Sequence, residues 1–207
     1  MNEHPIIFSQ PMVRALLDGR KTQTRRLAWR LPQMDGRGAG EAIDRGGVAK
    51  PSSWQRVKPG DRLWVREKFA PRISEQDDDT RRRYVKYAAD TNARSPSDEM
   101  DWHSWPRAWR PSIHMPRWAS RLTLTVTAVK IERLQDISGA DAMAEGAHKL
   151  KLSPTDRLHP SHQQEAIAYF HDLWDELHGE GAWQSNPEVV ALNFTVAKQN
   201  IDAGKSA

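Results

Sequence analysis

The chain of 207 residues contains no cysteine. Disulfide bonds and thiolate zinc sites are therefore excluded, and a reducing compartment is the natural setting for such a chain. The sequence also lacks a run of about 18 apolar residues, the length that a membrane-spanning helix requires. Its first residues lack the charged and apolar regions of a signal peptide. These absences predict a cytoplasmic protein with no membrane partner.

Sequence patterns typical of metal and cofactor sites are missing too. No His-Glu-x-x-His helix, phosphate loop or dinucleotide-binding glycine pattern occurs. His159 and His162 stand in a proline-flanked segment, and the acidic run Asp77 to Asp79 is typical of a solvated surface. We therefore predict neither a bound metal nor a cofactor.

Apolar residues are few for a chain of this length. They make up 38% of the sequence, and the mean hydropathy is −0.78, so the core must be small relative to the chain. Lysine and arginine number 31 against 27 aspartates and glutamates, a net charge of +4. This mild basic excess suits a polyanionic partner without requiring one.

Short apolar runs between turn residues indicate where strands form. The strands expected on this basis are residues 5–9, 23–29, 63–69, 84–88, 121–134 and 189–196. The helices expected from a start signal and a glycine stop are Pro11 to Gly19, Ser138 to Gly146 and Ser161 to Gly179. Pro59 and Gly60 suit the two central positions of a type II turn.

The long strand expected at 121–134 carries a change of phase. Leu124 and Val126 alternate with threonines, whereas Ile131 follows in the opposite phase. A slip of one residue moves the buried face to the other side of a strand. We therefore expect a bulge or barrel corner at 128–129.

The order of elements predicts a mixed α+β fold, a small β-barrel with peripheral helices. Two stretches with little apolar periodicity, at about 31–56 and 71–117, are interpreted as insertions into a single domain of residues 1–207. Residues 198–207 are interpreted as a polar tail.

Residues 18–26 concentrate polar chemistry in one short segment, Asp-Gly-Arg-Lys-Thr-Gln-Thr-Arg-Arg. If this segment is extended, alternation places Gln23 with Lys21 and Arg25 on one face and Thr24 on the other. Lys21 and Thr24 would meet only if the preceding turn curls Lys21 back, and we predict that it does.

This segment resembles part of the ASCH domain family, whose fold is a PUA-like β-barrel. The resemblance rests on Gly19-Arg20-Lys21-Thr22-x-Thr24 together with Pro59-Gly60-Asp61. The matching blocks are residues 5–27, 57–70, 118–146 and 183–197. The resemblance implies a PUA-like barrel with two long insertions, similar to long versions common in phage and prophage genomes, where a role with modified nucleic acid would fit.

The resemblance also implies a catalytic set. The closest functional analogy in the family is a small N4-acetylcytidine amidohydrolase, whose lysine, threonine and glutamate match Lys21, Thr24 and Glu145. Amide hydrolysis needs a nucleophile, a proton carrier and a donor for the developing oxyanion. Thr24 could be the nucleophile, activated by Lys21, with Glu145 passing the proton to the leaving amine. In a second assignment Thr24 donates to the oxyanion and Glu145 activates water. In a third interpretation these are ordinary strand-edge and solvated helix residues.

A nucleic-acid surface is expected from arginines and tryptophans in the same blocks. Guanidinium groups bind phosphate, and tryptophan rings stack on bases. The expected surface residues are Arg20, Arg25, Arg26, Trp64, Arg66, Arg117 and Trp118. Alternatively, these arginines pair with acidic neighbours such as Asp61 and Glu67 on a solvated surface.

Tryptophan is abundant relative to the other aromatic residues. Nine tryptophans stand against three tyrosines and four phenylalanines, and four of the nine lie in residues 102–118. This segment is either a lid that stacks on a base or a proline-stiffened loop that covers one end of the barrel. We favour the loop for Trp102 and Trp105.

The resemblance implies a protein that recognises a nucleoside or RNA and hydrolyses the amide of an N4-acylated cytidine or similar modified base. Two alternatives stay open. One is a non-catalytic module that binds RNA or a modified base. The other is a metal-independent ribonuclease, an activity reported for some ASCH-like proteins.

Overall fold

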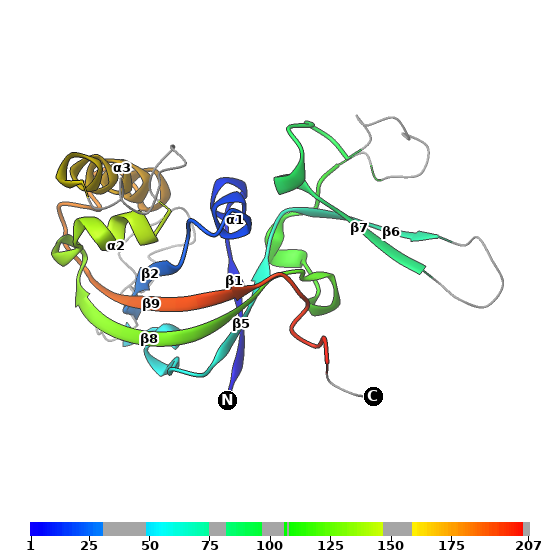
Figure 1. Cartoon of the computed structure of the whole chain (residues 1–207), viewed down its shortest axis with the longest axis horizontal. Helices are drawn as coiled ribbons and strands as arrows, with labels where there is room; N and C mark the ends of the chain where they lie inside the picture. The colour runs from blue at the N-terminus through cyan, green and yellow to red at the C-terminus, as the bar shows by residue number, and fades with distance from the viewer. Residues whose placement is uncertain (31–48, 75–81, 97–105, 107, 147–158, 205–207) are drawn as a thin grey trace. The chain divides into compact units, whose positions relative to one another are not determined.

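A computed structural model describes residues 1–30, 49–74, 82–96, 106, 108–146 and 159–204 (Figure 1). The chain divides into two compact units. The first unit comprises Met1–Gly19, Asp61–Thr125 and Val196–Ala207, and the second comprises Arg20–Gly60 and Val126–Thr195. The described elements mix helices and strands, which confirms the predicted α+β class. None of the described helices is long and apolar enough to cross a membrane.

The largest sheet is mixed and has five strands, in the order β1-β5-β8-β9-β2. Its strands are β1 (Glu3–Ile7), β5 (Arg62–Arg66), β8 (Thr123–Arg133), β9 (Glu188–Ala197) and β2 (Gln23–Leu27). β1 runs parallel to β5, whereas β5 with β8 and β2 with β9 are antiparallel. Among the described residues β1 and β2 are the two edges of this sheet, so strand pairing does not close it into a barrel.

The remaining strands form two small sheets of two strands each. β3 (Trp29–Arg30) pairs with β4 (Lys50–Pro51), and β6 (Phe69–Ser74) pairs with β7 (Arg82–Tyr87). Single turns of 3-10 helix are η1 (Ser53–Arg56), η2 (Ala88–Asp90), η3 (Ser112–His114), η4 (Arg117–Ala119) and η5 (Leu134–Asp136). The first predicted insertion lies outside the described residues from 31 to 48.

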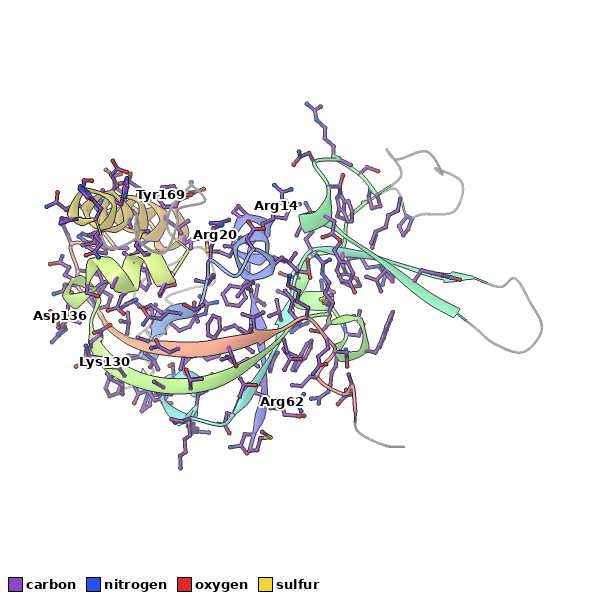
Figure 2. All side chains as sticks on the ribbon, viewed as in Figure 1. Arg14, Arg20, Arg62, Lys130, Asp136 and Tyr169 are labelled. Atoms are coloured by element: carbon purple, nitrogen blue, oxygen red, sulfur yellow. The ribbon has the colours of Figure 1, made fainter. Side chains whose placement is uncertain are left out.

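In the first unit, β5 is half-buried in the way that its sequence predicts. Leu63 and Val65 are buried, and the other three residues of the strand are partly exposed. Helix α1 (Gln10–Leu17) ends before Gly19, whose φ of 70° is readily adopted only by glycine. Arg14 of α1 (Figure 2) donates hydrogen bonds to the carbonyl oxygen of Ala89 and to Asn92 Oδ1, which holds α1 against η2 and the residues that follow it.

The second predicted insertion contains a two-stranded sheet of which only β7 was expected. Pro71 lies inside β6, and proline is typical of edge strands and turns, so the sequence pattern did not indicate a strand there. Phe69 at the start of β6 packs with Met115 and Ala119 in a small buried cluster. Trp109 is buried with Ala70 and Ala88, and Trp102 and Trp105 lie outside the described residues.

In the second unit, α3 (Pro160–His178) packs against α2 (Gly139–Ala144) (Figure 1). Ser138 caps α2, and the reciprocal hydrogen bonds between Ser138 and Asp141 confirm the predicted capping box. The helices approach closely at Gly139, where a Cβ atom would lie 2.3 Å from Gln163 Cβ. A buried cluster at this contact includes Met143 and Phe170.

The predicted phase change in β8 is wrong. Val126 is buried, but Ile131 is 51% exposed and Glu132 is 8% exposed, so even-numbered positions stay inward at both ends of the strand. The apolar pattern misled because the inward position near the end of β8 holds a carboxylate. Its partner is a buried arginine, Arg25.

The interpretation of residues 198–207 as a frayed tail is also wrong for the described part. Ile201 is fully buried, and Asn200 Nδ2 donates to the carbonyl oxygens of Arg117, Trp118 and Ser120 at 2.8, 3.3 and 2.7 Å. These bonds lie within the first unit. One buried isoleucine and one amide therefore anchor a segment whose composition is polar.

Replacing Asn200 by alanine should lower the free energy of unfolding by about 1 to 3 kcal/mol, because the carbonyl groups lose their donor. Urea denaturation followed by circular dichroism measures this loss. The matched control is Gln199→Ala, which removes a neighbouring exposed amide side chain and should change stability little. Equal effects of the two variants would contradict the anchoring role.

Candidate functional site

The backbone before β2 is held between α2 and β9 in the second unit. Thr22 N donates to the carbonyl oxygen of Ala144 at 2.8 Å, and Phe194 N donates to the carbonyl oxygen of Thr22 at 2.9 Å. Ala144 is the last residue of α2, and Glu145 is the C-cap residue that follows it. These bonds therefore bring Lys21 next to Glu145.

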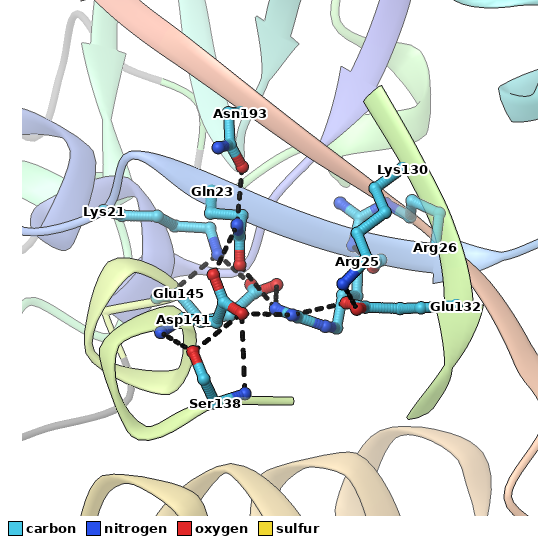
Figure 3. Close-up of polar contacts among 10 residues, drawn as sticks. All are labelled: Lys21, Gln23, Arg25, Arg26, Lys130, Glu132, Ser138, Asp141, Glu145 and Asn193. Carbon is cyan, nitrogen blue, oxygen red and sulfur yellow. Dashed lines mark hydrogen bonds and ion pairs between the residues drawn. The ribbon is translucent and has the colours of Figure 1, made fainter. Parts of the chain in front are cut away.

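Lys21 and Glu145 form a buried ion pair (Figure 3). Lys21 Nζ lies 2.7 Å from Glu145 Oε2 and donates a further hydrogen bond of 2.8 Å to the carbonyl oxygen of Glu145. The two side chains are 2% and 4% exposed. The structure thus brings together two of the three residues expected to be catalytic, 124 positions apart in the sequence.

Burial has the largest effect on the pKa of Lys21. Desolvation lowers this pKa from the ordinary value of 10.5, the carboxylate of Glu145 opposes the shift, and the charges of Arg26 and Arg25 add to it. The net result is a lowered pKa. A larger fraction of Lys21 is therefore a neutral amine near neutral pH than of an exposed lysine.

Thr24, the third expected catalytic residue, is buried in β2 opposite Leu192 of β9. Alternation along the strand places its side chain on the other face from Gln23 and Arg25. The hydrogen bond between Gln23 and Arg25 confirms that these two share a face. The role of Thr24 in catalysis stays a prediction.

Arg25 connects carboxylates from β8 and α2 (Figure 3). Its Nη2 lies 2.7 Å from Glu132 Oε1 and 3.4 Å from Asp141 Oδ2. Its Nη1 lies 3.2 Å from Glu145 Oε1 and donates to Gln23 Oε1 at 2.5 Å. One guanidinium group therefore links β2 to β8, which lies beyond β9 in the sheet, and to α2 with its C-cap residue Glu145.

The two oxygens of Glu145 face different cations. Oε2 contacts Lys21 and Oε1 contacts Arg25. A carboxylate held at both oxygens has one defined orientation, and its lone pairs are directed at Lys21 Nζ on one side. This geometry suits transfer of a proton between Glu145 and the amine.

Glu132, Asp141 and Gln23 belong to this network but were not among the expected site residues. Glu132 could have been found from its position in the inward phase of β8, which a charged residue occupies only with a partner. Asp141 was visible only as a capping residue. Nothing in the sequence connects Glu132 to Arg25 or Asp141 to Gln23, because the residues of each pair are more than 100 positions apart.

The surface role expected for Arg25 is corrected by the structure. Its side chain is fully buried and bound to carboxylates, so it presents no guanidinium to a phosphate. In the same unit Arg20 (Figure 2) and Arg26 are partly exposed. The guanidinium carbon of Arg26 lies 5.9 Å from the ring centre of Trp54.

The other expected surface residues belong to the first unit. The guanidinium carbon of Arg66 lies 5.4 Å from the ring centre of Trp64, and Trp118 is 41% exposed. Arg117 pairs with Asp202 at 2.7 Å and also with Glu3. For Arg117 the structure therefore shows pairing with acidic neighbours, the alternative that the sequence left open.

Asp61 and Glu67, the acidic neighbours that the sequence suggested for these arginines, accept hydrogen bonds from other groups. Glu67 is buried and accepts from Arg121 at 2.9 and 3.0 Å, and Asp61 accepts from the backbone nitrogen of Asn2 at 2.6 Å. Among the described residues no group of three or more histidines, aspartates or glutamates is arranged to hold a metal ion.

Comparison of the chain with protein-family models, with curated proteins and with solved structures finds no match.

Arg25→Met should lower the free energy of unfolding by about 3 to 5 kcal/mol, because Glu132 and Glu145 would be left as buried charges without this partner. Urea denaturation at neutral pH measures the loss. The control is Lys130→Met. Lys130 Nζ lies 2.6 Å from Glu132 Oε2, but the Lys130 side chain is 68% exposed. The control should cost far less, since solvent screens that pair. A similar cost for both variants would show that burial of Arg25 is not the stabilising feature.

Proposed function

We propose that the chain is an ASCH-type protein that binds a nucleoside or RNA and hydrolyses the amide of an N4-acylated cytidine or a similar modified base. The observation that carries the proposal is the buried contact of 2.7 Å between Lys21 Nζ and Glu145 Oε2. It joins the lysine of the Gly-Arg-Lys-Thr-x-Thr segment to the glutamate that the family resemblance pairs with it.

The arrangement of elements supports the ASCH-type fold as well. An edge strand, a short helix, the Lys21 segment and a strand after Pro59-Gly60-Asp61 follow each other in the chain, with Gly60 at a φ of 91°. A long strand, a short helix with Glu145 at its end and a closing strand complete the order. A PUA-like barrel that carries two insertions would have this order.

The reaction proposed is the addition of water across the amide, which yields cytidine and the free acid. The attacking oxygen forms a bond to the acyl carbon, its proton moves to the neutral amine of Lys21, and the C–N bond to the base breaks. Glu145 carries the proton to the leaving N4 nitrogen, so protons balance over the cycle. The attacking oxygen belongs either to Thr24, whose acyl ester water then hydrolyses, or directly to water. Both routes use the same contact between Lys21 and Glu145.

Binding without turnover is the second candidate, and one observation in the first unit favours it. Arg66 lies over Trp64, and Trp118 is exposed. Arginine and exposed tryptophan side chains are what a single-stranded nucleic acid contacts through phosphate and base.

Wild-type protein should release cytidine and acetate from N4-acetylcytidine. Lys21→Ala and Glu145→Gln should each lower kcat/KM by about 100-fold or more, because each removes a proton carrier. Mass spectrometry of a panel of modified nucleosides after incubation measures the product. The matched control is Lys198→Ala, an exposed lysine in the first unit, which should keep full activity.

Three other outcomes would separate the alternatives. Unchanged turnover in Lys21→Ala would remove this residue from the mechanism. A lack of product, combined with salt-dependent affinity for RNA that Arg26→Ala weakens, would indicate the binding module. Shortening of a labelled RNA in the presence of a chelator would indicate the ribonuclease.

The pH profile of hydrolysis should report the Lys21 amine. Because only the neutral amine can accept a proton and its pKa is lowered, kcat/KM should rise with pH along a limb centred below 10.5, the ordinary lysine value. The rate of hydrolysis without enzyme is subtracted at each pH. A limb centred at or above 10.5 would contradict the assignment of Lys21 as the base.

A further inference from the structure

Asn193 lies at an exposed position of β9, directly opposite Gln23 of β2. Side chains of directly paired residues in antiparallel strands lie on the same face. Asn193 Oδ1 accepts a hydrogen bond of 2.5 Å from Gln23 Nε2 (Figure 3). Asn193 is therefore the exposed end of the buried polar network.

The direction of every hydrogen bond in this part of the network follows from Arg25. A guanidinium group can only donate, so the Gln23 atom that lies 2.5 Å from Arg25 Nη1 is the amide oxygen. The NH2 group of Gln23 then faces Asp141 Oδ1 at 3.0 Å and Asn193 at 2.5 Å. Because this NH2 group can only donate, the atom of Asn193 that faces it is the oxygen.

The charge of Asp141 supports the same orientation of the Gln23 amide, with its NH2 group as the donor. Burial acts to raise the pKa of Asp141, but hydrogen bonds from Gln23 and Ser138 and the charge of Arg25 outweigh it and lower the pKa below its ordinary value. At neutral pH Asp141 is an ionised carboxylate that can only accept. It thereby fixes the NH2 group of Gln23 independently of Arg25.

The NH2 group of Asn193 is left as a directed donor. In Figure 3 its nitrogen points away from Gln23, and no described residue accepts a hydrogen bond from it. An ordinary surface asparagine can flip its amide freely, whereas a flip here would set two NH2 groups against each other. The chain from Arg25 through Gln23 thus holds a donor in place at the exposed end of the network that also orients Glu145.

We infer that Asn193 Nδ2 is a specificity-determining donor that binds the acceptor edge of a cytosine ring, formed by N3 and O2. The inference rests on the proposed function, because it concerns the base that is presented to Lys21 and Glu145. Acylation at N4 leaves both ring acceptors available. A donor that cannot flip favours such a ring over one with a hydrogen at N3, such as uracil, at that position.

The test is Asn193→Asp. Aspartate has the same shape and can still accept from Gln23, so the buried network is retained, but the outward donor becomes an acceptor. KM for N4-acetylcytidine and Kd for cytidine should both rise about tenfold or more, while kcat changes less than KM. Asn193→Ala removes the donor without adding charge. It should weaken binding by a smaller factor. If the aspartate variant proves less stable, the alanine variant still tests whether the donor contributes to binding.

The matched control is Asn92→Asp in the first unit. Asn92 is also exposed, and its Oδ1 also accepts from an arginine, Arg14, at 3.0 Å. This variant makes the same chemical change away from the network and should leave KM and Kd unchanged. A weakening equal to that of Asn193→Asp would overturn the inference.

The outcomes separate the inference from the proposed function. Hydrolysis by wild type with unchanged KM and Kd in both folded Asn193 variants overturns the inference alone. Binding of cytidine without hydrolysis overturns the hydrolase function, and weaker binding by Asn193→Asp then still supports the donor. A wild-type protein that neither binds nor hydrolyses these nucleosides overturns both.

Discussion

A cation that is removed from water must be met by carboxylates, and this constraint shapes the second unit. Lys21 and Arg25 stand on one short segment, and both are almost fully buried. Glu145 and Glu132 supply one carboxylate to each, and Glu145 touches both cations. Since a buried charge without a partner costs several kcal/mol, β2, β8 and α2 must keep the positions that bring these charges together.

The same network can serve stability and chemistry through different members. Arg25 can only donate hydrogen bonds, and it orients Glu145 and Gln23. Lys21 has a lowered pKa and can exchange a proton with the carboxylate that Arg25 holds. We interpret Arg25 as the residue that orients the site and Lys21 as the residue that exchanges the proton. Arg25 orients the amide of Gln23, and Gln23 in turn orients the amide of Asn193 at an exposed position.

Local signals in the sequence were sufficient for several elements, and long-range contacts account for the failures. The capping box at Ser138 and the glycine that follows α1 act within one helix turn, so the sequence alone predicts them. Glu132 was missed because its inward position depends on Arg25, 107 positions away. Asn200 was missed in the same way, because its three acceptors lie about 80 positions earlier. Lys21 and Glu145 were paired by family resemblance, and neither composition nor periodicity indicates that contact.

The most direct test of the account is an NMR titration of the Lys21 amine in protein labelled at lysine, with Lys21→Arg used to assign the signal. The account predicts a pKa below the ordinary 10.5 in wild type. It also predicts a still lower value in Glu145→Gln, because Glu145 opposes the shift caused by burial. A Lys21 amine that titrates at or above 10.5, or one that does not respond to Glu145→Gln, would contradict the buried pair on which the proposed chemistry depends.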